Sequence, residues 1–189
     1  MISMFKAAVY LNTQHFICIR KLVIFIPSVF LLSGTVYYFV LEKSLSKDAD
    51  ITKLVVHKGD RKMLAYAGDK LLKTYTISLG HSPVGPKQFE GDNRTPEGDY
   101  FIDGKNPNSV CHKNLGISYP NETDAALARK LGKPAGGEIK IHGLKNGQGF
   151  IGKFHRFKDW TNGCIGVTDA EIDELYNHVN VGTPISIQP

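Results

Sequence analysis

A run of 20 residues without a charge, from Leu22 to Leu41, does most to limit how this chain can fold. Twenty residues of α-helix rise about 30 Å, which matches the hydrocarbon core of a bilayer. Arg20 and Lys21 stand directly before the run, and this placement keeps the N-terminus cytoplasmic and exports the residues after the run. The sequence therefore predicts a cytoplasmic segment at 1–21, a transmembrane signal anchor at 22–41, a linker at 42–50 and an exported domain at 51–189.

A cleaved signal peptide is the alternative for the same run. Such a peptide has an apolar core of about 7–15 residues and an Ala-x-Ala-like cleavage site. Ser33-Gly34-Thr35 is a poor version of that site, so the sequence favours the uncleaved anchor. The anchor implies that the protein sits in the cytoplasmic membrane with its domain on the periplasmic side.

The net charge of +5 depends partly on this N-terminal part. The first 41 residues hold Lys6, Arg20 and Lys21 but no acid, which leaves 20 basic and 18 acidic side chains in the remainder. A domain so nearly neutral gives no reason to expect nucleic acid as a partner.

Hydrophobic periodicity predicts a β-rich α+β domain. Residues 54–56 and 63–66 read as a hairpin around Gly59-Asp60. Further strands are expected at 71–79, 100–102, 138–142 and 185–187, with a loop-rich stretch at 104–120.

Two short helices complete the prediction. Thr123 or Asp124 caps the first, which ends at Leu131, and Thr168 with Glu171 forms a capping box for the second at 172–179. These elements predict a sandwich or a partly closed barrel.

His142 and Cys164 are the residues with the clearest chemical meaning. A thiol attacks as thiolate, and a nearby imidazole can take its proton. His142 shares a strand face with Lys140, opposite the face of Ile139 and Ile141, which favours a functional site over a core histidine. Gly163, before the cysteine, leaves room for an acyl group and backbone N–H groups for a developing oxyanion. The sequence thus predicts a cysteine acyl-transfer enzyme.

The segment from Ile141 to Val167 resembles the catalytic signature of the L,D-transpeptidases with a YkuD-type domain. Their pattern of His-Gly, a spacer and Ser/Thr-x-Gly-Cys is present as His142-Gly143 and Thr161-Asn162-Gly163-Cys164. Residues 95–100, Thr-Pro-Glu-Gly-Asp-Tyr, are similar to the Thr-Pro-x-Gly turn of the family. The string from His155 to Val167 looks more like the YafK-like subgroup, in which amide hydrolysis also occurs.

The resemblance implies a substrate and a mechanism. Cys164 would attack the carbonyl of a diaminopimelate residue in a peptidoglycan stem peptide, with His142 as base and the carbonyl of Gly143 or of a loop residue orienting the imidazole. An amine, including one on a wall-attached protein, would accept the acyl group; with water instead, the enzyme would be a hydrolase. The family has a β-rich sandwich fold, and no cofactor is implied.

This chain departs from the family at two positions. Many members carry His or Arg before the Gly-Cys pair and Arg two residues after the cysteine, where this chain has Asn162 and Gly166. The side chains expected to bind substrate in their place are Thr161, Asn162, His155, Arg156 and Trp160. Trp160 could instead pack beneath the loop, Thr161 could merely shape it, and the glycines from Gly143 to Gly152 suggest a flap or a turn-rich loop.

Two alternatives use the same residues differently. Cys111 and Cys164 could form a disulfide that closes a non-catalytic wall-binding domain, worth about 4 kcal/mol in the chain-entropy model. His142, His155 and Cys164 could hold zinc, but no second cysteine stands at ligand spacing, so no metal is expected.

Overall fold

The computed structural model describes residues 32–38 and 42–189. The expected cytoplasmic segment and most of the expected anchor lie outside these residues, and so neither is tested. Residues 32–38 are helical. Within the described ranges, no helix combines the length and apolarity needed to span a bilayer.

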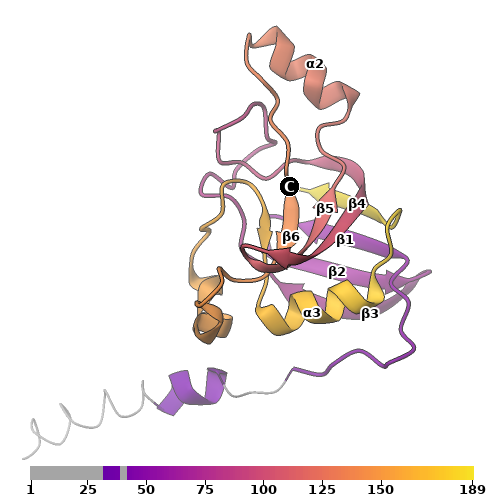
Figure 1. Ribbon diagram of the computed structural model, residues 1–189, viewed down its shortest axis with the longest axis vertical. Coiled ribbons are helices and arrows are strands. Elements are labelled where there is room, and N and C mark those ends of the chain that lie inside the picture. The colour runs from indigo at the N-terminus through magenta and orange to yellow at the C-terminus, as the bar shows by residue number, and fades with distance from the viewer. Residues whose placement is uncertain (1–31, 39–41) are drawn as a thin grey trace, which may run out of the picture. The chain divides into compact units, whose positions relative to one another are not determined.

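Residues 43–189 form a compact unit around one curled, mixed sheet. Its strands lie in the order β3-β2-β1-β8-β4-β5-β6-β7, and the connections include short helices (Figure 1). In chain order the elements are β1 (Lys53–His57), β2 (Lys62–Ala67), β3 (Lys70–Thr76), β4 (Gly98–Ser109), β5 (His112–Ile117), α2 (Glu122–Lys130), β6 (Lys140–His142), the 3₁₀ helix η1 (Gly149–Phe157), β7 (Ile165–Gly166), α3 (Asp169–His178) and β8 (Pro184–Gln188).

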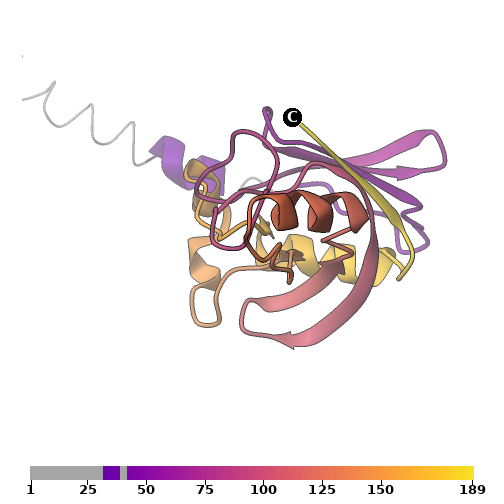
Figure 2. The same cartoon turned by 90° about the horizontal axis from the view of Figure 1, so that it is seen from above.

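The predicted partly closed barrel is confirmed, because the sheet bends through the long β4–β5 hairpin. Figure 2 shows this hairpin curving away from the plane of β1, β2 and β3, with α3 in the hollow of the curve. The register between β4 and β5 shifts twice, between Ile102 and Gly104 and between Asn106 and Ser109. Such irregularities increase strand bending, which lets one sheet wrap around its own core.

Alternating side chains fill that core. Leu54 and Val56 of β1 and Ile185 of β8 are wholly buried, and the two strands pair in parallel. Ile172 and Leu175 of α3 enter the same core from the hollow side. β8 lies between β1 and β4, so a strand from the end of the domain joins its two halves.

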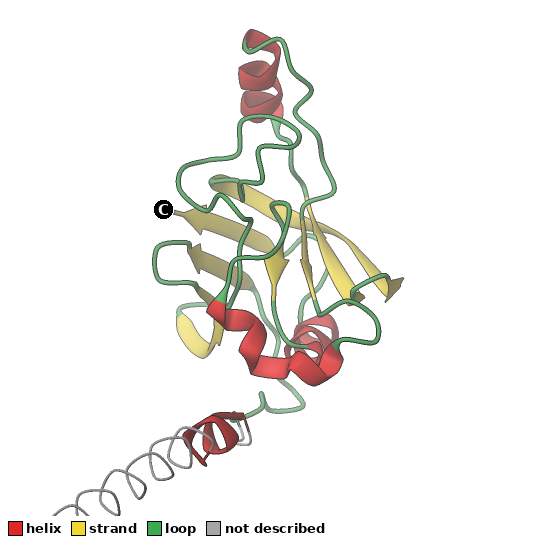
Figure 3. Ribbon diagram, turned by 90° about the vertical axis from the view of Figure 1, so that its left-hand side faces the viewer, coloured by secondary structure: helices red, strands yellow, loops and turns green. Residues whose placement is uncertain are grey.

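Several predicted elements are confirmed and others are wrong. The β1–β2 hairpin, the closing strand and the helix capped by Thr168 and Glu171 are present. The stretch at 104–120 is not a loop, because most of it belongs to β4 and β5. Asn121, rather than Thr123 or Asp124, caps α2. The glycine-rich segment before the cysteine contains η1, which lies beside α3 (Figure 3).

Candidate active site

Cys164 stands at the entrance of β7 on a loop with a fixed shape. The Thr161 hydroxyl donates to the Cys164 carbonyl at 2.7 Å and accepts from the Gly163 N–H at 3.2 Å. Gly163 has a φ of +130°, and a Cβ there would lie 2.7 Å from the carbonyl oxygen of Arg94. Only glycine fits here without a shift of the backbone. The close contact with Arg94 therefore holds the loop, and with it the Cys164 sulfur, in position.

His142 ends β6 and is held by its own neighbour. Its Nδ1 lies 2.7 Å from the carbonyl oxygen of Gly143, and the residue is 7% exposed. A carbonyl can only accept, so the proton of the neutral ring is on Nδ1 and Nε2 carries the free lone pair. This tautomer suits a base, since Nε2 is ready to take a proton.

The strand register places the two side chains on one face of the sheet. Ile141 pairs with Ile165, and both side chains are buried in the core. Cys164 precedes Ile165 and His142 follows Ile141, so both point to the opposite face. Standard sheet dimensions then put their Cα atoms about 8 Å apart, which two side chains can bridge.

Both groups are neutral near pH 7. Burial raises the pKa of the Cys164 thiol, against smaller lowering effects of the Lys140 N–H and of the Lys140 and Lys87 charges. Burial lowers the pKa of His142, partly offset by its bond to Gly143. The resting site therefore holds a thiol and a neutral imidazole rather than an ion pair.

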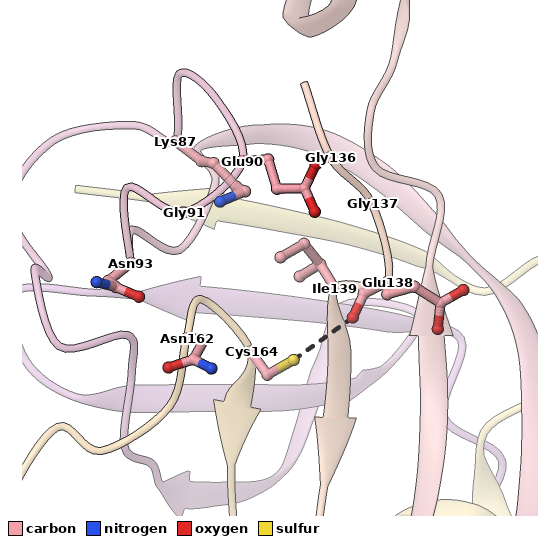
Figure 4. A pocket seen from close by; sticks show the side chains of 10 residues that line it. All are labelled: Lys87, Glu90, Gly91, Asn93, Gly136, Gly137, Glu138, Ile139, Asn162 and Cys164. Atoms are coloured by element: carbon pink, nitrogen blue, oxygen red, sulfur yellow. Dashed lines mark hydrogen bonds between the residues drawn. The ribbon is translucent and has the colours of Figure 1, made fainter. Parts of the chain in front are cut away.

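A pocket of about 370 Å³ opens in front of the sulfur (Figure 4). Its walls come from the loop after β3, the segment before β6 and the cysteine loop, and its lining residues are Lys87, Glu90, Gly91, Asn93, Gly136, Gly137, Glu138, Ile139, Asn162 and Cys164. The sulfur lies 3.5 Å from the carbonyl oxygen of Glu138. This volume lies within the range of small-molecule sites.

The pocket contains both signs of charge. Lys87 is 4% exposed and forms a 2.8 Å ion pair with Asp92, while Glu90 and Glu138 add carboxylates. Glu138 also pairs with Lys140. Such a lining suits a ligand that itself carries an amine and a carboxylate.

Trp160 occupies the space over Gly166. A Cβ on Gly166 would lie 3.0 Å from the indole ring, so the ring rests directly on the β7 backbone. The same ring meets His142 edge-on, with centroids 5.5 Å apart and planes at 73°. Trp160 therefore lies between the β7 backbone and the imidazole.

The five residues that the sequence predicts to bind substrate lie in different parts of the structure. Asn162 lines the pocket with Cys164, whereas Thr161 is 4% exposed and is bonded within the loop. His155 is buried and lines another cavity together with Trp160. Arg156 forms a 2.7 Å ion pair with Glu171, in which both side chains are buried. The structure therefore does not bring these five residues together around the sulfur.

Cys111 and Cys164 are both free thiols, so no disulfide joins them. Over residues 32–38 and 42–189, no three His, Cys, Asp or Glu side chains are grouped as metal ligands.

The pattern in the sequence did not point to Lys87, Glu90 or Glu138 as pocket residues. The loop after β3 brings Lys87 and Glu90 to the cysteine loop because its backbone packs closely there. At Gly80, for example, an added Cβ would lie 2.1 Å from the carbonyl oxygen of Asn93 and 3.0 Å from the Cα atom of Gly163. Several glycines and prolines between 80 and 98 hint at a shaped loop, but they do not say which residue it meets.

Comparison with known proteins identifies the class. Residues 51–187 match the family described as YkuD, L,D-transpeptidase catalytic domain. The chain therefore belongs to the YkuD-type L,D-transpeptidase family.

Particular relatives can be named. The chain is 30% identical over 113 residues to the protein described as putative L,D-transpeptidase YafK of Escherichia coli K12, a match that spans 58% of this chain and 38% of YafK. It is similar in structure to the helical cell shape determining protein Pgp2 of Campylobacter jejuni, with a TM-score of 0.55, 25% identity and coverage of 74% of this chain and 48% of Pgp2. An L,D-transpeptidase from Mycobacterium smegmatis, with a TM-score of 0.50, 15% identity and coverage of 75% and 59%, shares the fold.

Proposed function

We propose that this protein is a cell-wall cysteine acyltransferase that acts on diaminopimelate-containing stem peptides of peptidoglycan. The observation that carries the proposal is the position of Cys164, half-buried at a pocket and on the same sheet face as His142. Membership of the L,D-transpeptidase family supports the reaction class. The chain spans less than half the length of the named relatives YafK and Pgp2, so the activity of the whole protein is part of the proposal.

In the proposed reaction, Nε2 of His142 takes the proton of the Cys164 thiol as the sulfur attacks the donor carbonyl. The Gly143 carbonyl keeps the imidazole in the required tautomer and stabilises the imidazolium that forms. That imidazolium then gives its proton to the leaving amine, which leaves a thioester on Cys164.

Backbone N–H groups at the cysteine loop are proposed to stabilise the developing oxyanion. The Gly163 N–H already donates to Thr161, so it would have to exchange that 3.2 Å bond for the oxyanion. The Cys164 N–H is the other proposed donor. Thr161 thus acts mainly by holding the loop, as its two bonds suggest.

The pocket charges support a zwitterionic donor. Diaminopimelate carries an amine and a carboxylate at the end of its side chain, and Glu90, Glu138 and Lys87 offer partners of opposite sign. Asn162 adds an amide at the pocket edge. Lys87 is paired with Asp92, so in this proposal it would share its ammonium between Asp92 and the substrate carboxylate.

The site of action is proposed from the sequence. The 20-residue uncharged run at 22–41 would anchor the chain in the cytoplasmic membrane and place the domain in the periplasm. An amine of a neighbouring stem peptide or of a wall protein would then be within reach as acyl acceptor.

A carbapenem tests the nucleophile, because its strained amide acylates a competent cysteine. We expect a covalent adduct on Cys164 by mass spectrometry, lost in Cys164→Ala and slowed by about 10²-fold or more in His142→Ala. His57→Ala is the matched control, since His57 lies on β1 away from the pocket. An adduct on Cys111, or acylation unchanged by His142→Ala, contradicts the proposal.

Incubation with a wall peptide and a competing amine separates transfer from hydrolysis. The acyl-enzyme is common to both, so the ratio of amide product to free acid reports which acceptor reaches it. Accumulation of free acid alone, at any amine concentration, would replace the transferase with a hydrolase.

A further inference from the structure

Lys58, the residue after β1, is a buried lysine outside the pocket in front of Cys164 (the donor pocket). Its residue exposure is 2%, and it does not line that pocket. Its ammonium nitrogen donates to the carbonyl oxygen of Gly85 at 2.7 Å, to that of Thr95 at 2.9 Å and to a carboxylate oxygen of Glu97 at 2.8 Å. An ammonium has three N–H donors, so each donor of Lys58 has an acceptor.

These bonds fix the ammonium of Lys58 in one place. A buried charge is costly unless it is paired and hydrogen-bonded. Burial lowers the pKa of Lys58, and the hydrogen bond and charge of Glu97 oppose this effect. The backbone of Lys58 is held as well, because its N–H donates to the Gln188 carbonyl at 3.0 Å. Lys58 therefore connects the end of the sheet to its three acceptors.

Two of the acceptors stand at the two ends of one loop. Gly85 comes before the stretch from 86 to 94 and Thr95 comes directly after it. This stretch carries the pocket residues Lys87, Glu90, Gly91 and Asn93 (Figure 4). The Thr-Pro-Glu-Gly turn at 95–98 supplies both the Thr95 carbonyl and the carboxylate that pairs with Lys58. One nitrogen atom thus holds both ends of this pocket wall together.

Apolar burial does little to hold the same loop. In the described stretch from 81 to 94, Lys87 is the only residue that is buried, and Val84 is 83% exposed. Asp92 pairs with Lys87 at 2.8 Å and accepts from the Arg94 N–H at 3.0 Å. Those bonds shape the loop internally, whereas the bonds of Lys58 attach it to the end of β1.

The cysteine loop has supports of its own. The Thr161 N–H donates to the Leu79 carbonyl at 3.1 Å. The Thr95 hydroxyl accepts from the Gly80 N–H at 3.1 Å, which keeps the Thr95 backbone beside the cysteine loop. A change at Lys58 is therefore expected to move the pocket wall more than the sulfur.

We propose that Lys58 is a positioning residue for the donor, because its ammonium holds both ends of the loop from 85 to 95 and so sets where the charged side chains of that loop meet the substrate. This inference rests on the proposed function. Lys58 acts through Gly85 and Thr95 and does not contact the donor. Loss of its ammonium then weakens donor binding without removing the nucleophile.

The test removes the ammonium and its carboxylate partner together, since loss of Lys58 alone would leave Glu97 without its ion pair. Lys58→Met with Glu97→Gln keeps a long side chain, but no ammonium reaches the two carbonyls. Lys73→Met with Glu174→Gln is the matched control, because it removes another largely buried ion pair, of 2.6 Å, between β3 and α3 and outside the pocket lining. Far-UV circular dichroism shows that each variant is folded.

Acylation of the full chain in a non-ionic detergent separates binding from chemistry. Varying the carbapenem concentration gives an apparent dissociation constant and a limiting rate. In the Lys58 double variant we expect the dissociation constant to rise about tenfold and the limiting rate to stay within about twofold. Alkylation of Cys164 by iodoacetamide, a reagent too small to need the pocket wall, stays unchanged. An unchanged dissociation constant, or an equal rise in the control variant, overturns the inference.

Lys58→Arg is a second variant that keeps the charge and the pairing with Glu97. A planar guanidinium spreads its donors over three nitrogen atoms, so it cannot bring the three acceptors of Lys58 to one atom. We expect the dissociation constant of the carbapenem to rise by several-fold, with the limiting rate preserved. A dissociation constant equal to that of the unaltered protein would show that charge alone suffices, and it would contradict the positioning role.

Hydrogen exchange measured by mass spectrometry follows the loop without any reaction at Cys164. Peptides that cover residues 86–94 should exchange about tenfold faster in the Lys58 double variant than in the control variant, because the loop then opens locally. Equal exchange in the two variants overturns the inference. If the carbapenem never acylates Cys164 in the unaltered protein, the proposed function fails, while the exchange experiment still decides whether Lys58 holds the loop.

Discussion

Acidification is expected to destabilise the domain through His155. Burial, and then the charges of Arg156 and His142, lower the pKa of His155 to about 4. In the unfolded chain the imidazole has its ordinary pKa of about 6.5. Between these two pKa values the imidazole is protonated in the unfolded state and neutral in the folded state. The contribution of His155 to stability is therefore fully present above about pH 6.5 and falls as the pH decreases towards about 4.

The magnitude is set by the same two pKa values. At pH 5 the difference in proton binding costs about 2 kcal/mol, and below pH 4 it approaches about 3 kcal/mol. This is a large part of the roughly 5–15 kcal/mol that typically holds a domain folded. Because His155 is only 6% exposed, solvent screens its charge little, and this free-energy difference is not reduced by screening.

The assay compares the protein with His155→Gln, which cannot titrate but can still form hydrogen bonds. Urea unfolding followed by far-UV circular dichroism gives the free energy of unfolding at pH 7.5 and at pH 5.0. We expect the unaltered protein to lose about 2 kcal/mol more than the variant between the two. Carboxylates with lowered pKa values, such as those of Asp92 and Glu174, titrate in both proteins and cancel in the comparison. Equal losses would refute the reasoning.

Three further changes test the site and its supports. Gly163→Ala places a Cβ 2.7 Å from the backbone oxygen of Arg94, so we expect carbapenem acylation to slow by about a hundredfold; an unchanged rate would show that the loop can shift freely. Arg156→Met removes the ion pair that Arg156 forms with the buried Glu171, and urea unfolding should show a loss of about 3 kcal/mol; an unchanged free energy of unfolding would contradict this. Because burial raises the pKa of Cys164, its alkylation by iodoacetamide, measured by peptide mass spectrometry, should still accelerate near pH 9, and a plateau below pH 8 would contradict this.

Elements defined by neighbouring residues could be predicted from the sequence. Thr168 and Glu171 satisfy each other's backbone N–H groups within four residues, so α3 carries its own start signal. The β1–β2 hairpin likewise results from alternating apolar residues on both sides of a short turn. In both cases the contacts that stabilise the element are local.

The β4–β5 hairpin could not be predicted in this way, because its stability comes from distant partners. β4 pairs with β8, and β5 pairs with β6, more than 20 residues further along the chain. Pro107 and several polar residues hide the alternation, since the outer parts of these strands face solvent. Here tertiary pairing overrides weak local preference.

The same distinction applies to the site. Cys164 and His142 stand out because glycines and a strand pattern surround them in the sequence. Lys87 and Glu90 reach the pocket only because the loop after β3 folds back against the cysteine loop. Charged residues on a polar loop carry no local sign of what they will face, so the pocket wall is a product of the fold.

The position of β8 determines when the domain can assemble. This strand is the last in chain order, yet it stands between β1 and β4 and pairs with both. While the chain is being synthesised, the two halves of the sheet therefore have no common partner until Pro184–Gln188 have emerged. The sheet is then completed only at the end of synthesis, and loss of these few residues would leave two open sheet edges prone to aggregation.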